Sequence, residues 1–237
     1  MRRVLLALLA AIAVFVVASP AFAGIPKDPK WKSSDPSVGW NNAGFVLNNN
    51  EWNGSAPQTI WADSFHHWGA ESTQPKANRV VQSYPCVEKN FNEVPVRSVR
   101  VIQSGFTESM PRDKSGLAAE AANDVWLNNH TIEVMIWVDN HTEIPFGRPM
   151  SHATIFGQHF RVWHGGTTFT FALNHNETRG VTHILAAIKW LIKRRQIPSN
   201  ATLTQISFGW EIASTDGKAK DFTVRKYWLH ATPLRAR

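Results

Sequence analysis

Most segments of this chain alternate between apolar and polar residues with a period of two, and this pattern restricts the possible folds. Successive side chains of a β-strand point to opposite faces, so the alternation predicts strands with one buried face. Residues 159–163 and 167–171 show it on either side of His164-Gly165-Gly166, whose glycines suit the positive φ angles of a hairpin turn. Turn-forming Asn, Asp and Gly recur between the other segments. The sequence therefore predicts an all-β antiparallel sandwich or barrel.

One segment departs from the alternation and predicts a helix. Between Thr182 and Arg195, apolar residues recur at helical spacing. The segment ends in a basic run, residues 193–195, and Pro198 follows it. Cations interact favourably with the free carbonyls of a last helical turn, and proline prevents continuation. We expect one helix that packs on a sheet, with the basic run at its C-terminus.

The first 23 residues have the pattern of a secretory signal peptide. Arg2 and Arg3 precede an apolar run over residues 4–18, and Ala21-Phe22-Ala23 provides a cleavage site. The alternative, a membrane anchor, needs about 20 apolar residues, and this run is shorter. No repeat or linker divides the remainder. We therefore expect a secreted protein that does not bind membranes, with residues 24–237 as a single domain.

Composition excludes several classes of function. The chain has 25 Lys and Arg against 18 Asp and Glu, but the basic residues are scattered, so we expect no nucleic acid partner. The single cysteine, Cys86, excludes an intrachain disulfide and a thiolate metal site. His66 and His67 would point to opposite faces of a strand, and no metal-binding or nucleotide-binding motif is present. We expect a monomer with no metal and no cofactor. The 11 tryptophans offer flat surfaces on which ring-shaped ligands stack.

Two predicted strands carry a glutamate on the face that is not apolar. In residues 132–138, four β-branched residues form one face, whereas Glu133, Met135 and Trp137 form the other. An acid, a thioether and an indole are unusual on a solvent face, so we expect them to line a concave surface. In residues 205–213, Glu211 shares its face with small residues, which would leave a groove with a carboxylate in its floor.

Paired carboxylates are the groups that cleavage of a glycosidic bond requires. One attacks the anomeric carbon while the other protonates the departing oxygen, and a separation of about 5–5.5 Å gives retention of configuration. The alternative is that each glutamate is simply solvated on an outer face. The spacing of the residues leaves both interpretations open.

The same two strands resemble the signature strands of glycoside hydrolase family 12, the endoglucanases and xyloglucanases. Residues 133–137 resemble the nucleophile strand of that family, and residues 208–212 resemble its acid/base strand. Weaker matches follow the family order from about Trp40 to Phe222, at residues 49–52, 81–85, 122–127 and 168–172. The resemblance implies a β-jelly roll of two antiparallel sheets with a concave cleft for a glucan chain.

The resemblance also implies roles for seven residues. Glu133 would be the nucleophile, Glu211 the general acid and then base, and Asp124 an auxiliary aspartate near the nucleophile. The implied substrate-binding residues are Trp52, which would stack on a sugar ring, Met135 beneath the reacting sugar, and Trp137 and Asn50 in the cleft. Asn53 departs from the glycine usual in the family, and the disulfide of many members cannot form here.

We therefore expect a secreted endo-acting β-1,4-glucanase that hydrolyses cellulose, mixed-linkage glucan or xyloglucan with retention. The alternative is a jelly-roll protein that binds glycans without cleaving them.

Overall fold

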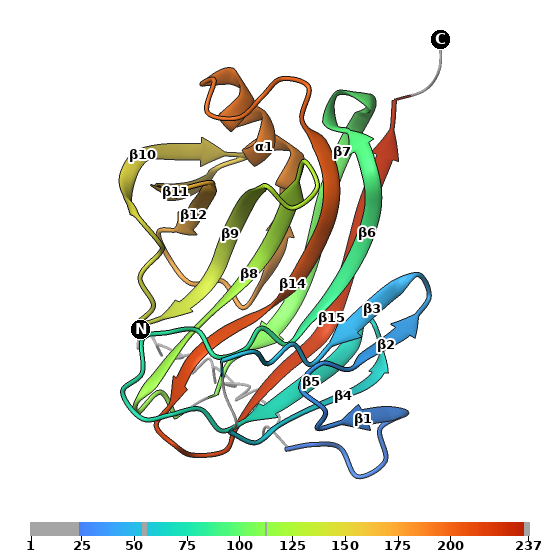
Figure 1. Cartoon of the computed structure of the whole chain (residues 1–237), viewed down its shortest axis with the longest axis vertical. Helices are drawn as coiled ribbons and strands as arrows, with labels where there is room; N and C mark the ends of the chain where they lie inside the picture. Colours follow the sequence, from blue (N-terminus) through green and yellow to red (C-terminus); the bar gives the residue numbers. More distant parts are fainter. Residues whose placement is uncertain (1–23, 54–55, 112, 235–237) are drawn as a thin grey trace, which may run out of the picture.

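The chain forms two β-sheets packed face to face (Figure 1). The computed structural model describes residues 24–53, 56–111 and 113–234. The expected signal peptide, residues 1–23, lies outside the described residues. The smaller sheet has six strands, in the order β1 (Trp31–Ser33), β4 (Gln58–Ser64), β5 (His67–Ser72), β15 (Lys220–Pro233), β7 (Val99–Ser109) and β13 (Arg179–Thr182).

The larger sheet has nine strands and carries the two glutamate segments near its centre. Its order is β10 (Arg148–Ile155), β11 (Gln158–Gly165), β12 (Thr168–Leu173), β9 (Ile132–His141), β8 (Leu117–Leu127), β14 (Thr202–Thr215), β6 (Cys86–Pro95), β3 (Phe45–Asn48) and β2 (Gly39–Asn42). The expected hairpin is present, because Gly165 of β11 pairs with Thr168 of β12 and Gly166 in the turn has a φ of 58°. A short 3₁₀-helix, η1 (Val96–Ser98), joins β6 to β7.

The core lies between the sheets and consists of the strand faces that the alternation predicted to be apolar. Val134 and Ile136 of β9 are buried in one cluster with Ile206 of β14. Trp210 of β14 lies in a second cluster, where its ring centroid is 5.0 Å from that of Trp68 on β5. The predicted inner faces of both glutamate strands are therefore confirmed.

The predicted helix is confirmed as α1 (Ile184–Lys193), which packs against the inner side of the larger sheet near β11 and β12 (Figure 1). Its apolar residues share a cluster with Val162 and Phe171, and the ring of Trp190 meets that of Phe171 edge to face. The basic run begins at the last helical residue. Arg194 lies just beyond the helix, with its guanidinium 3.7 Å from the centroid of the Trp190 ring.

One strand pair differs from the expected antiparallel arrangement. β12 pairs with β9 in parallel, with Thr168 opposite Glu133. The chain leaves β9, crosses to the sheet edge at β10 and returns through the antiparallel strands β11 and β12, so that β12 reaches β9 running in the same direction. Among the described residues, no helix has both the length and the apolar character that crossing a bilayer demands.

Candidate active site

The two predicted glutamates lie on the outer face of the larger sheet, turned away from the core, and both are partly exposed. Glu133 of β9 pairs with Trp126 of β8, and Glu211 of β14 pairs with Glu120 of β8. Trp126 and Glu120 are separated by an even number of positions along β8, so their side chains share one face. The strand β8 therefore lies between the two glutamates, and their carboxyl groups are on the same side of the sheet.

These two carboxyl groups lie close enough for the charge of Glu133 to affect the protonation of Glu211. Burial raises the pKa of Glu133, and the Thr168 hydroxyl opposes that rise by donating a 2.7 Å hydrogen bond to Glu133 Oε2. Burial, and after it the charge of Glu133, raises the pKa of Glu211 to about 7. Glu133 therefore ionises first, and Glu211 holds its proton up to neutral pH.

Asp124 lies on β8 between the two glutamate strands. It pairs with Met135 of β9 on one side and with Ser207 of β14 on the other. Its side chain is 6% exposed, and its Oδ1 atom has no hydrogen-bond partner among the described residues. Burial, followed by the charges of Glu133 and Glu211, raises its pKa well above the ordinary value. Burial and the two neighbouring charges therefore favour the protonated form of Asp124.

The segment that carries Asn50 and Trp52 lies beside the Glu211 end of β14. The Trp52 backbone N–H donates to the Gln82 carbonyl over 3.1 Å, and the Gln82 N–H donates to the Ile212 carbonyl over 2.9 Å. Half of the Trp52 surface is exposed, and Asn50 is also exposed. An exposed indole here leaves a flat face free for a sugar ring.

Met135 and Trp137 lie on the same outer face as Glu133. Both are buried, and they form a small apolar cluster with Ala122 of β8 and Ala172 of β12. The structure therefore places all seven residues predicted for the site on the larger sheet or on the segment next to Glu211.

Comparison with known proteins matches this chain to a family. The model of glycosyl hydrolase family 12 matches residues 43–229, a span that includes β8, β9 and β14. The chain belongs to glycosyl hydrolase family 12. It is therefore a glycoside hydrolase, and the predicted family is confirmed.

Solved structures of the family share the fold of this chain. The xyloglucanase domain of a type three effector from Sinorhizobium fredii, solved with cellobiose, is 23% identical, with a TM-score of 0.74 over 86% of this chain and 100% of that one. A family 12 xyloglucanase from Bacillus licheniformis is 19% identical, with a TM-score of 0.73 over 85% and 100%. An endoglucanase from Rhodothermus marinus is 16% identical, with a TM-score of 0.76 over 86% and 100%. The jelly-roll fold expected from the sequence is confirmed.

The expected open groove above the small residues beside Glu211 is wrong in one respect. Tyr84 occupies space over Ser207 and Ala122, since its hydroxyl donates to the Ala122 carbonyl and accepts from Ser207 Oγ. Gly209 has no free room either, because a Cβ atom there would lie 2.2 Å from the Pro85 carbonyl oxygen. The small residues allow neighbouring segments of the family 12 fold to approach closely rather than leaving an open channel.

Two residues next to the glutamates were not predicted from the sequence to belong to the site. Thr168 donates to Glu133, and Glu120 is buried beside Glu211. In the sequence, Thr168 was an alternating polar position in a strand and the first residue of the weak family match over residues 168–172, and neither feature indicated its contact with Glu133. Glu120 lies in a run of alanines, where a lone acid could have signalled a buried functional carboxyl.

The histidine pair and the cysteine hold no metal-binding geometry. His66 Nδ1 lies 2.6 Å from the Tyr227 carbonyl oxygen, and His67 Nδ1 lies 2.9 Å from Asp63 Oδ2. Within residues 24–53, 56–111 and 113–234, no group of three or more His, Cys, Asp or Glu could hold a metal ion. Cys86 is buried, and burial raises the pKa of its thiol, which keeps it in the unreactive form.

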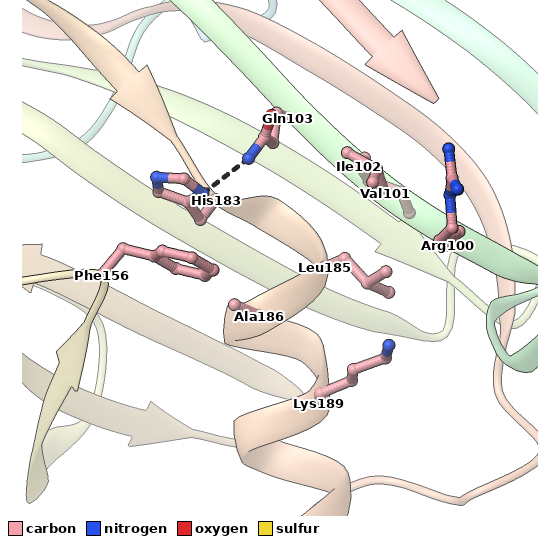
Figure 2. A pocket seen from close by; sticks show the side chains of 9 residues that line it. All are labelled: Arg100, Val101, Ile102, Gln103, Phe156, His183, Leu185, Ala186 and Lys189. Atoms are coloured by element: carbon pink, nitrogen blue, oxygen red, sulfur yellow. Dashed lines mark hydrogen bonds between the residues drawn. The ribbon is translucent and has the colours of Figure 1, made fainter. Parts of the chain in front are cut away.

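A separate cavity of about 280 Å³ lies between β7, the β10–β11 turn and α1 (Figure 2). Phe156 stacks on the ring of His183, and Gln103 Nε2 lies 2.8 Å from His183 Nδ1. Within the part of the chain that the structure describes, no carboxylate lines this cavity. It therefore lacks the acid and nucleophile that glycosidic bond cleavage requires.

Proposed function

We propose that this protein is a secreted, endo-acting β-1,4-glucan hydrolase that cleaves cellulose, mixed-linkage glucan or xyloglucan with retention of configuration. The observation that carries the proposal is the position of Glu133 and Glu211 on one sheet face, on either side of β8, with different proton affinities. Related structures named as xyloglucanases and endoglucanases support the substrate class. The signal-peptide pattern of residues 1–23 supports secretion.

The different proton affinities assign the roles of the two glutamates. Glu133 is the nucleophile, because the Thr168 hydroxyl stabilises its ionised form. It attacks the anomeric carbon while Glu211 transfers its proton to the departing glycosidic oxygen, which leaves a covalent glycosyl-enzyme. Glu211, now ionised, then removes a proton from water, and the water oxygen displaces Glu133 from the anomeric carbon. The second step restores both carboxyl groups to their starting states.

Three further residues prepare this reaction. Asp124, in its protonated form, offers a hydrogen-bond donor on the same face as the nucleophile Glu133. Trp52 stacks on a sugar ring with its exposed face, and Asn50 offers its amide beside it. Met135 and Trp137 form the apolar floor beneath the reacting sugar, next to Glu133 on the same strand.

The stereochemistry of the first product tests this mechanism. Two displacements at one carbon restore its configuration, so we expect the reducing end released from a β-glucan to be the β-anomer at first. Proton NMR during the opening minutes of hydrolysis measures this before mutarotation intervenes. Initial release of the α-anomer would contradict the covalent step. A chain that binds β-glucans but releases no reducing ends from any of the three would contradict the proposed substrate class.

The hydrogen bond from Thr168 makes a second prediction. In Thr168→Val the shape of the side chain is kept but the donor is lost, so the pKa of Glu133 should rise. The acid limb of the kcat/KM profile should then move to higher pH by about one unit. Thr170→Val is the matched control, because Thr170 lies on the same strand and face and its hydroxyl has no partner among the described residues. Equal acid limbs in both variants and in the wild type would exclude the role of Thr168.

A further inference from the structure

Glu120 is a third carboxyl group beside Glu211 that the proposed reaction does not use. The two residues pair directly across β8 and β14, a position in which Cβ atoms are about 4.5–5.5 Å apart. Glu120 is fully buried, at 0% exposure. Within ordinary hydrogen-bond geometry neither of its carboxyl oxygens has a partner among the described residues. The two carboxyl groups are nevertheless close enough that a hydrogen-bonding interaction between them raises the pKa of Glu120 and lowers that of Glu211.

An ionised carboxylate in this position would be very unfavourable. A carboxyl group that is buried without a partner for its charge binds a proton instead of remaining ionised. Burial and then the charge of Glu211 raise the pKa of Glu120 well above its ordinary value. The titratable groups that face it are acids or a phenol: Glu211 from β14, Asp124 from β8, Glu143 from the segment after β9, and Tyr84 from the segment before β6.

Among the residues that the structure describes, no cation forms an ion pair with Glu120 or contributes to its pKa shift. Burial raises the pKa of Glu143, and the charge of Arg79 partly opposes that rise. The Arg79 guanidinium donates to the Thr142 carbonyl over 2.7 Å. A protonated carboxyl has one O–H donor, and a buried donor is stabilised only if it finds an acceptor. The side chain opposite on β14, Glu211, is the acceptor that the strand register supplies.

We propose that Glu120 is a positioning residue for Glu211: it keeps its proton and donates a hydrogen bond to the Glu211 carboxylate when Glu211 is ionised. The proposal rests on the acid/base role proposed for Glu211. That hydrogen bond would orient the carboxylate that activates water in the second step. It would also stabilise the ionised form of Glu211, and so set the pH above which Glu211 can no longer act as an acid.

Two substitutions distinguish whether Glu120 acts on Glu211 as a hydrogen-bond donor or as a negative charge. Glu120→Gln keeps a donor in nearly the same shape, so the basic limb of the kcat/KM profile should stay close to that of the wild type. Glu120→Leu keeps the site dry but removes the donor, so the pKa of Glu211 and the basic limb should rise by about one unit. At a pH above the limb, that shift is a tenfold gain in relative kcat/KM over the wild type.

Other outcomes would overturn the proposal. If both variants moved the basic limb to lower pH, Glu120 would be ionised in the wild type, since removing a neighbouring negative charge lowers the pKa of Glu211. If neither variant moved it, Glu120 would be only a structural residue. Glu108→Gln is the matched control, because Glu108 is also a buried acid but faces the core, where it accepts from Trp210 Nε1. The basic limb of the kcat/KM profile should be at the same pH in Glu108→Gln as in the wild type.

A second readout does not depend on catalysis. Carbon-13 NMR of carboxyl-labelled glutamate, with the Glu211 signal assigned by its loss in Glu211→Gln, measures the pKa of Glu211 in the wild type and both Glu120 variants. A rise in Glu120→Leu alone supports the proposal even if the wild type cleaved none of the glucans. If the pKa of Glu211 were the same in Glu120→Leu as in the wild type, and the wild type cleaved β-glucans, the role of Glu120 would be rejected and the proposed function would stand.

Discussion

Replacing Glu133 with glutamine is expected to lower kcat on a soluble β-glucan by roughly 10⁴–10⁶-fold, the range seen when a nucleophile is removed from an enzyme. A neutral amide cannot form the covalent bond to the anomeric carbon that the first displacement requires. The fold should persist, because glutamine has the same shape and its carbonyl oxygen can still accept from Thr168. Reducing-end release measures the activity, and thermal unfolding measures the stability.

The matched control for this experiment is Glu88→Gln. Glu88 of β6 lies in the same row of the outer face as Ser207 and Asp124, and burial raises its pKa as it does that of Glu133. It accepts a hydrogen bond from Gln205 but has no proposed role in bond cleavage. We expect the activity of Glu88→Gln to stay within about tenfold of that of the wild type, because the Glu88 carboxylate takes no part in bond cleavage. Near-normal turnover in Glu133→Gln would disprove the assignment of the nucleophile.

Replacing Glu211 with glutamine is expected to lower kcat/KM on glucans by roughly 10²–10⁴-fold, the usual contribution of a general acid or base. The loss in the first step should be much smaller on an aryl β-cellobioside, because a phenolate with a low pKa departs without being protonated. Glu133→Gln should show no such recovery. Comparing the two substrates therefore distinguishes the acid from the nucleophile.

The same variant makes a prediction about pH. Since the pKa of Glu211 is about 7, the wild type should lose activity as the pH rises through neutrality, where Glu211 gives up its proton. In Glu211→Gln that basic limb should disappear, because no proton is left to lose. A wild-type profile that stays flat well above pH 7, or an unchanged limb in the variant, would contradict the acid/base role.

The alternation of the sequence was enough to predict the strand faces. On β9 the β-branched residues of one face form part of the core, and the opposite face carries Glu133. The same holds for β14, with Trp210 inside and Glu211 outside. These faces follow from the local geometry of a strand, in which neighbouring side chains point in opposite directions whatever the partner strands are. The helix could be predicted for the same reason, from its own local period.

The pairing between strands is what the sequence could not specify. The parallel contact of β12 with β9 brings the Thr168 hydroxyl to Glu133, and it depends on a chain path that no local pattern records. Likewise, the register of β8 against β14 places Glu120 opposite Glu211, and Tyr84 fills room that the small residues suggested was open.

The sequence by itself therefore determined which residues could face the substrate, because each strand's period is a local property. Only the tertiary structure decided which of those residues meet. Contacts between strands far apart in the chain depend on register, and register sets the burial and the neighbouring charges that raise the pKa of Glu211 toward neutrality.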